Sequence, residues 1–141
     1  MKIIIFYEKP GCSTNKRQKQ VLREAGYKII ERNLMHHGLS IDELRSFFQN
    51  KPMKEWFNTN APQIKNGLVN PDSLGKKEAL RLLFDTPLLI KRPLMLIEGQ
   101  RLSGFDQNRI EELLKTSLAY KVSNSCSSHD EACHLDKRSV S

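Results

Sequence analysis

The chain has no apolar run long enough to cross a membrane, which requires about 18 or more consecutive apolar residues. The apolar run at residues 3–7 is also too short for the core of a signal peptide, and no small-residue cleavage site follows it. Cysteine is scarce, with three residues in 141, and Cys12 lies far from Cys126 and Cys133. This spacing is not typical of the disulfide framework of a small secreted protein. We therefore expect a cytoplasmic protein that makes no contact with a membrane.

The chain also lacks a recognisable nucleic-acid-binding motif, although its formal net charge is +7. Residues 120–141 contain as many basic as acidic side chains, so the excess positive charge belongs to the rest of the chain. No basic patch is interleaved with aromatic residues, so no stacking surface for nucleotides is indicated. A solvated basic surface is favoured over direct DNA binding, and an anionic substrate or an acidic protein partner is the alternative.

A cysteine stands at the junction that organises the chain. Residues 3–7 predict a strand buried on both faces, residues 9–11 predict a turn, and a helix is expected from Ser13 until Gly26 ends it. At such a junction Cys12 meets unpaired backbone N–H groups and the positive end of the helix dipole, which favour the nucleophilic thiolate. Lys9, Lys16 and Arg17 add nearby positive charge. The alternative role for Cys12 is that of a small buried apolar residue.

The remaining pattern predicts two groups of strands separated by helices. Strands are expected at residues 2–7, 28–32, 94–97 and 101–103. A capping box at residues 40–43 opens a helix, and further helices are expected at 52–57, at 76–85 and after residue 106. The order βαβ, helical block, ββα predicts an α/β protein with a thioredoxin-like fold, a four-stranded mixed sheet and an all-helical insertion. The expected domain spans residues 1–116, with the insert at about 39–89, and residues 117–141 are expected to form a flexible polar tail.

Four segments in the right order resemble a known family. They are residues 6–12 (FYEKPGC), 56–58 (WFN), 87–93 (PLLIKRP) and 104–106 (GFD). The chain resembles the arsenate reductase (ArsC)/Spx family over about residues 2–114, and within it the branch of nitrogenase-associated proteins. The resemblance implies the same thioredoxin-like fold that the pattern predicts.

The resemblance also implies a site. Cys12 matches the family's catalytic nucleophile, and Arg92 matches an arginine that stabilises the oxyanion and precedes the active-site proline, Pro93. The start of the helix is expected to bind the anion through Ser13, Thr14, Asn15 and Lys16. No bound cofactor or metal is expected. Glutathione is the expected co-substrate, with glutaredoxin as a protein partner.

The sequence departs from the family at three positions. Asn58 and Gly104 stand where arsenate reductases carry arginines, and losing each charge-assisted bond costs roughly 1.5–3 kcal/mol, which argues against arsenate as the substrate. Asn15 stands where Spx-type regulators carry the second cysteine of their redox switch. We therefore expect monothiol chemistry at Cys12. The alternatives are a binding protein, acting at RNA polymerase in the manner of Spx or with a nitrogenase-related protein, and a redox-inactive relic of the fold.

The tail contains a second group of thiols and imidazoles at Cys126, His129, Cys133 and His134. These side chains can in principle hold zinc, but their spacing is not that of a familiar zinc finger and the flanking sequence has almost no apolar residues. A tail cysteine could also resolve a disulfide formed by Cys12. A polar tail without a metal site is the expectation.

Overall fold

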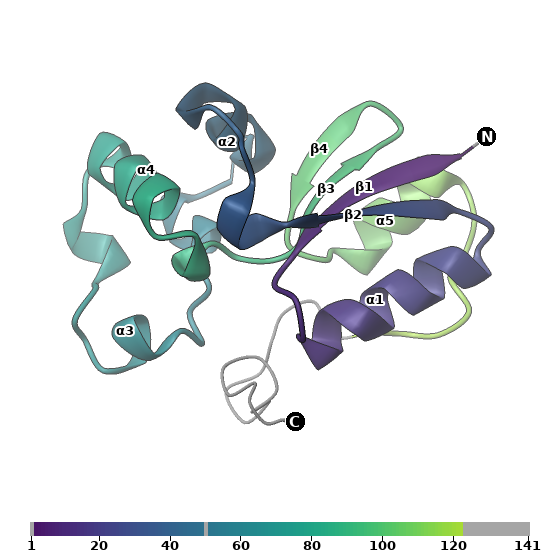
Figure 1. Ribbon diagram of the computed structural model, residues 1–141, viewed down its shortest axis with the longest axis horizontal. Helices are drawn as coiled ribbons and strands as arrows, with labels where there is room; N and C mark the ends of the chain where they lie inside the picture. The colour runs from purple at the N-terminus through teal and green to yellow at the C-terminus, as the bar shows by residue number, and fades with distance from the viewer. Residues whose placement is uncertain (1, 50, 123–141) are drawn as a thin grey trace.

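The protein contains a mixed four-stranded sheet in the computed structural model, which describes residues 2–49 and 51–122 (Figure 1). The strands are β1 (Ile3–Glu8), β2 (Lys28–Asn33), β3 (Leu94–Ile97) and β4 (Gln100–Ser103). The helices are α1 (Ser13–Glu24), α2 (Ile41–Phe48), α3 (Pro62–Lys65), α4 (Lys76–Asp85) and α5 (Gln107–Leu114). Short 3-10 helices occur at η1 (Leu34–His36), η2 (Met53–Trp56), η3 (Pro71–Ser73) and η4 (Pro87–Leu89).

The strand order β2-β1-β3-β4 confirms the predicted α/β class and the mixed sheet. β1 pairs parallel with β2 through the α1 crossover, and antiparallel with β3. β3 and β4 form a hairpin whose turn residues, Glu98 and Gly99, have φ angles of 48° and 77°. Positive φ at both central residues is the geometry of a tight two-residue hairpin turn, so β4 begins at Gln100, slightly before its predicted start.

Two apolar clusters form the core. The first lies between one face of the sheet and helices α1 and α5, where Ile4 and Phe6 of β1 meet Val21 and Leu22 of α1. The second belongs to the predicted helical insert and reaches the sheet at Leu94. Figure 1 shows the insert, with α2, α3 and α4, beside the sheet rather than over the face that α1 and α5 cover. Within the described residues, no helix is long and apolar enough to cross a membrane.

The insert differs in detail from the sequence prediction. The capping box that opens α2 is present, with Ser40 and Glu43 bonded reciprocally. The predicted helix at residues 52–57 is the 3-10 helix η2, and the predicted loop at residues 60–71 contains α3. Pro62 begins α3 directly after the buried Ala61, so a single turn forms where the polar composition indicated a loop.

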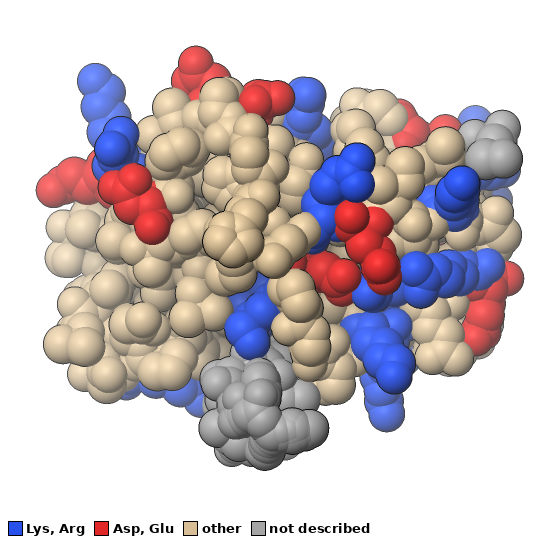
Figure 2. All heavy atoms as spheres, viewed as in Figure 1, with Lys and Arg blue, Asp and Glu red and all other residues tan. Residues whose placement is uncertain are grey.

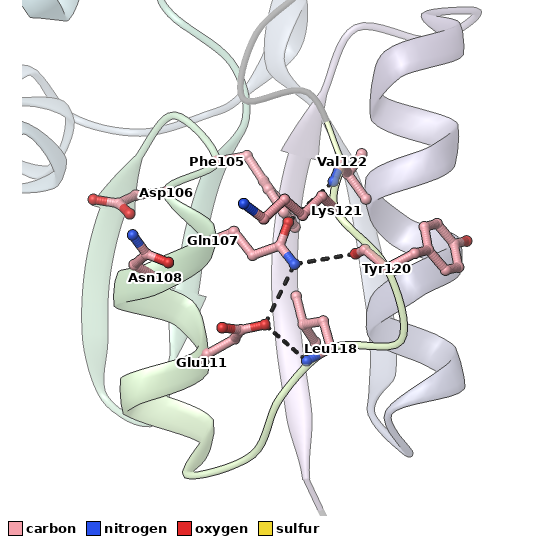
Figure 3. A pocket seen from close by; sticks show the side chains of 9 residues that line it. All are labelled: Phe105, Asp106, Gln107, Asn108, Glu111, Leu118, Tyr120, Lys121 and Val122. Atoms are coloured by element: carbon pink, nitrogen blue, oxygen red, sulfur yellow. Dashed lines mark hydrogen bonds between the residues drawn. The ribbon is translucent and has the colours of Figure 1, made fainter.

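The segment after α5 contacts the domain beyond its predicted end at residue 116. Leu118 is buried in the first core, and its backbone N–H donates to Glu111 at 2.9 Å. The side chain of Gln107 donates to Tyr120 O at 3.0 Å and accepts from Val122 N at 3.0 Å. Figure 3 shows these α5 side chains pointing toward the segment across a pocket of about 450 Å³. Residues up to 122, which the sequence assigned to a tail, thus pack on the domain. The tail group at Cys126, His129, Cys133 and His134 lies outside the described residues.

Candidate functional site

A tight turn carries the chain from β1 to Cys12. The backbone N–H of Cys12 donates to Lys9 O at 3.1 Å, and Gly11 has a φ of +86°. Proline followed by a residue with positive φ is the pattern of a type II turn, for which Pro10 and Gly11 are suited. A side chain at position 11 would strain this conformation. The turn therefore places Cys12 directly at the start of α1.

Cys12 is the N-cap residue of α1. Its Sγ accepts a hydrogen bond from Asn15 N at 3.5 Å, and its carbonyl accepts from Lys16 N at 3.0 Å. The sulfur thus occupies the position at which serine or aspartate oxygen usually caps a helix. No acidic side chain lies in the first turn of α1, so no negative charge there offsets the positive end of the helix dipole near the sulfur. The residue is buried, with 3% of its surface exposed.

Arg92 and Pro93 lie at the same end of the sheet as Cys12. Tyr7 of β1 pairs with Leu94 of β3 in an antiparallel register, so the chain leaves β1 where it enters β3. The Arg92–Pro93 peptide bond is cis, and Pro93 O accepts from Gly104 N at 2.8 Å. Arg92 is only 5% exposed. The register thus places the predicted nucleophile, arginine and proline at one end of the sheet.

The helical insert holds the segment that carries Arg92. Phe57 forms an isolated antiparallel bridge with Ile90, and Lys91 N donates to Trp56 O at 2.9 Å. Asn58 N donates to Leu89 O at 2.8 Å. These backbone bonds join residues 56–58 to residues 89–91, so two of the segments that carry the family resemblance are paired in space.

The predicted anion-binding residues differ in their surroundings. Ser13 and Lys16 are exposed at the start of α1, and Thr14 is largely buried. The side chain of Asn15 is 1% exposed and bonds within the protein, since its Oδ1 accepts from Lys9 N at 3.3 Å and its Nδ2 donates to Gln18 at 2.9 Å. Ser13, Thr14 and Lys16 therefore remain the predicted anion-binding residues, whereas Asn15 has structural partners that the sequence did not reveal.

Sequence reasoning also missed an ion-pair cluster beside the site. Lys19 Nζ lies 2.7 Å from Glu8 Oε1, at the end of β1, and 2.5 Å from Glu31 Oε2 on β2. Burial of Lys19 opposes its charge, but hydrogen bonds to Glu31 and Glu8 outweigh it and raise the pKa of Lys19. The hydrogen bond from Lys19 holds the pKa of Glu31 below its ordinary value of 4.5. The cluster joins β1, α1 and β2 where the Cys12 turn begins. The sequence did carry a signal for this cluster: Lys19 stands four residues after Asn15 and three before Leu22, on the buried side of α1.

Replacing Glu31 with glutamine should lower the free energy of unfolding near pH 7 by roughly 0.2–1 kcal/mol, because an ion pair this exposed contributes little. The Glu31 side chain is 45% exposed. Since its pKa is lowered in the folded state, its contribution is complete above the unfolded value and is lost as the pH falls through the folded value. Urea unfolding at about pH 7 and about pH 3 tests this. A difference between wild type and variant that is equal at both pH values would contradict the assignment.

The two positions at which the family's arginines are absent have other roles here. Asn58 is largely buried, and its Oδ1 accepts from Asn60 N at 3.2 Å, which fixes the turn before α3. Gly104 has a φ of +76°, and a Cβ at this position would come within 3.2 Å of Lys91 Cε. Neither position supplies a cation, as the sequence indicated.

Comparisons with known proteins agree with this geometry. The ArsC family model matches residues 7–113. A 15.7 kDa uncharacterised protein in the draG 3′ region of Rhodospirillum rubrum is 38% identical over 104 residues, covering 74% of this chain and 73% of the relative. The global transcriptional regulator Spx 2 of Bacillus cereus is 27% identical over 118 residues, covering 82% and 90%. The crystal structure of an ArsC family related protein from Bacteroides fragilis matches with a TM-score of 0.67 at 27% identity, covering 78% and 96%.

The fold, with a cysteine capping the helix that follows β1, defines a protein of the thioredoxin-like class that is similar to arsenate reductases and Spx regulators. The chain belongs to the ArsC family, since the family model covers most of its length. The resemblance predicted from residues 6–12, 56–58, 87–93 and 104–106 is confirmed.

Proposed function

We propose that the protein is a thiol-dependent oxidoreductase in which Cys12 is a single nucleophilic thiol and glutathione completes the cycle. The observation that supports this function best is the hydrogen bond from Asn15 N to Cys12 Sγ at the positive end of α1. A thiolate accepts such a bond more strongly than a thiol does, so the bond is suited to the form of Cys12 that attacks in disulfide exchange. Cys12 is the only cysteine in residues 1–122, so a second thiol for the cycle has to come from outside the domain.

The cycle consists of two thiol–disulfide exchanges. The Cys12 thiolate first attacks the glutathione sulfur of a substrate mixed disulfide, forms a disulfide with that glutathione and releases the substrate thiolate, which takes up a proton from water. The thiolate of a second glutathione then attacks the glutathione sulfur of this adduct, forms glutathione disulfide and releases the Cys12 thiolate. One mixed disulfide and one glutathione thus become one free thiol and one glutathione disulfide.

Arg92 and the start of α1 would hold the anionic groups of the substrate or the adduct. Arg92 is buried at the same end of the sheet as Cys12, and the first-turn residues Ser13 and Thr14 lie at the positive end of the helix dipole. In the view of Figure 2, the half of the molecule that contains the sheet and α1 carries lysines and arginines together with acidic side chains. A carboxylate-bearing thiol such as glutathione suits Arg92 and the exposed Lys16 at the start of α1. Arsenate suits them less, since Asn58 and Gly104 leave Arg92 without the family's two other arginines.

The charge preference can be measured by alkylation. Iodoacetate, an anion, should react with Cys12 faster relative to neutral iodoacetamide than it does with an unstructured peptide thiol. Lys16→Ala should reduce this rate ratio about twofold, because a unit charge roughly 8 Å away contributes about 0.5 kcal/mol in water. Lys77→Ala, an exposed charge change at the start of α4, should leave the ratio unchanged and serves as the control.

Salt dependence and comparison with a peptide thiol test whether the start of α1 attracts anions. The ratio in the wild type should fall as salt is added, because salt screens exposed charges. A wild-type ratio equal to that of the peptide thiol, unaffected by Lys16→Ala, would contradict an anion-binding role for the start of α1.

The alternative function is that of a binding protein. It is favoured by the match to Spx 2, which extends over 90% of that regulator. Asn15, at the position of the second cysteine of the Spx-type switch, leaves such a protein without that redox control. In this case the partner would be RNA polymerase or a nitrogenase-related protein. Saturable binding to one of these purified partners, with no thiol exchange at Cys12, would support the binding protein over the oxidoreductase.

A further inference from the structure

The side-chain amide of Asn15 is buried and has no role in the cycle described above. Its surface is 1% exposed, although it lies in the first turn of α1, where polar side chains usually face water. Three hydrogen bonds tie it to its surroundings, and two of them reach the two ends of the turn that delivers Cys12. We propose that Asn15 is the positioning residue for the Cys12 sulfur. This inference rests on the proposed function, in which Cys12 is the nucleophile.

The bonds of Asn15 close a ring around the turn. Its Oδ1 accepts from Lys9 N at 3.3 Å, and its backbone N–H donates to Cys12 Sγ at 3.5 Å. Cys12 N in turn donates to Lys9 O at 3.1 Å. One residue thus binds the first and the last residue of the turn, so the turn cannot shift relative to α1 without breaking a bond to Asn15. The sulfur is held at the end of the helix, where the dipole acts on it.

Gln18 fixes the orientation of the Asn15 amide. A backbone N–H such as that of Lys9 only donates, so the oxygen of the Asn15 amide has to face it and the NH₂ group has to find an acceptor elsewhere. Gln18 Oε1 is that acceptor at 2.9 Å, and Gln18 is fully buried. Gln18 therefore acts on Cys12 only through Asn15.

This arrangement gives a physical reason for monothiol chemistry. A cysteine at position 15 would supply a resolving thiol but would lose the amide oxygen that accepts from Lys9 and the amide nitrogen that donates to Gln18. With asparagine at position 15 the domain has no second thiol, but the Cys12 sulfur is held in place by the bonds of Asn15. Precise placement of a reacting atom has large effects on rate, since a displacement of about 1 Å can cost about a hundredfold.

The test compares Cys12 alkylation by iodoacetamide, across a range of pH, in the wild type and five variants of the full chain. Asn15→Ala should lower the second-order rate constant roughly tenfold, and Gln18→Met should lower it less. The double variant should be no slower than Asn15→Ala, because Gln18 acts through Asn15. Asn15→Asp keeps the acceptor for Lys9 but places a negative charge beside the sulfur, so its alkylation should require a higher pH. Gln20→Ala, a change of an exposed glutamine on the same helix, should behave as wild type.

The outcomes separate this inference from the proposed function. A folded Asn15→Ala variant with the rate and pH profile of a reactive wild type would overturn the positioning role and leave the oxidoreductase intact. A wild type that alkylates as slowly as a peptide thiol would instead remove the proposed function. If Asn15→Ala does not fold, Gln18→Met and Asn15→Asp decide the question, and unchanged rates and pH profiles in both would overturn the inference.

Discussion

Replacing Cys12 with serine should lower glutathione-dependent turnover more than about a thousandfold, to the uncatalysed background, because a serine hydroxyl does not replace the thiolate as a nucleophile in disulfide exchange. The fold should survive this change. Serine is a preferred N-cap residue and its oxygen can accept the Asn15 N–H, so stability should stay the same or rise by up to about 1 kcal/mol. A coupled assay that follows glutathione disulfide measures the loss, and thermal unfolding measures the stability.

The matched control removes the other two thiols. A variant with Cys126→Ser and Cys133→Ser should keep its turnover, since the proposed cycle uses an external thiol to resolve the adduct. Loss of turnover in this double variant would show that a tail cysteine completes the cycle. Turnover that persists in Cys12→Ser would contradict the assignment of the nucleophile.

Trp56→Ala should be the most destabilising single change in the helical insert, at about 3–5 kcal/mol, as is typical for removal of a large buried aromatic ring. Trp56 is fully buried and stacks on Phe48 with ring centroids 4.9 Å apart. Its Nε1 donates to Lys51 O at 3.0 Å, and Arg45 lies over its ring at 4.8 Å. Alanine would leave a cavity, an unpaired carbonyl and an arginine without its aromatic partner.

Urea unfolding followed by circular dichroism measures this effect, and Trp56→Phe is the control, since it keeps most of the stacking and should lose less stability. Because Trp56 O accepts from Lys91 N next to Arg92, Trp56→Ala should also slow turnover at temperatures where the variant is still folded. A loss of less than about 1 kcal/mol would show that the insert does not depend on this cluster.

The sequence predicted the strand, the turn and the helix start that position Cys12, because each of these features depends on residues close together in the chain. An apolar run, the pair Pro10 and Gly11, and a cysteine followed by a helix together predict a strand, a turn and an N-cap without knowledge of the rest of the chain. The capping box at Ser40 and Glu43 could be predicted for the same reason, since its two partners are three residues apart.

Features that depend on distant partners could not be predicted. Periodicity assigns charged residues to the surface, yet Lys19 is buried because Glu8 and Glu31, on two strands, pair with it. Leu118 stands in a polar stretch, and its burial depends on the packing of the segment against α5 and the sheet. The backbone bonds between residues 56–58 and 89–91 likewise join parts of the chain that only the fold brings together.

Intact-protein mass spectrometry after exposure to glutathione disulfide tests the central proposal most directly. We expect one glutathione adduct, located at Cys12 by peptide mapping, which forms faster than on an unstructured peptide thiol and is removed by added glutathione. Cys12→Ser should form no adduct within residues 1–122. A wild type in which Cys12 stays unmodified while Cys126 or Cys133 carries the adduct would contradict a monothiol cycle at Cys12.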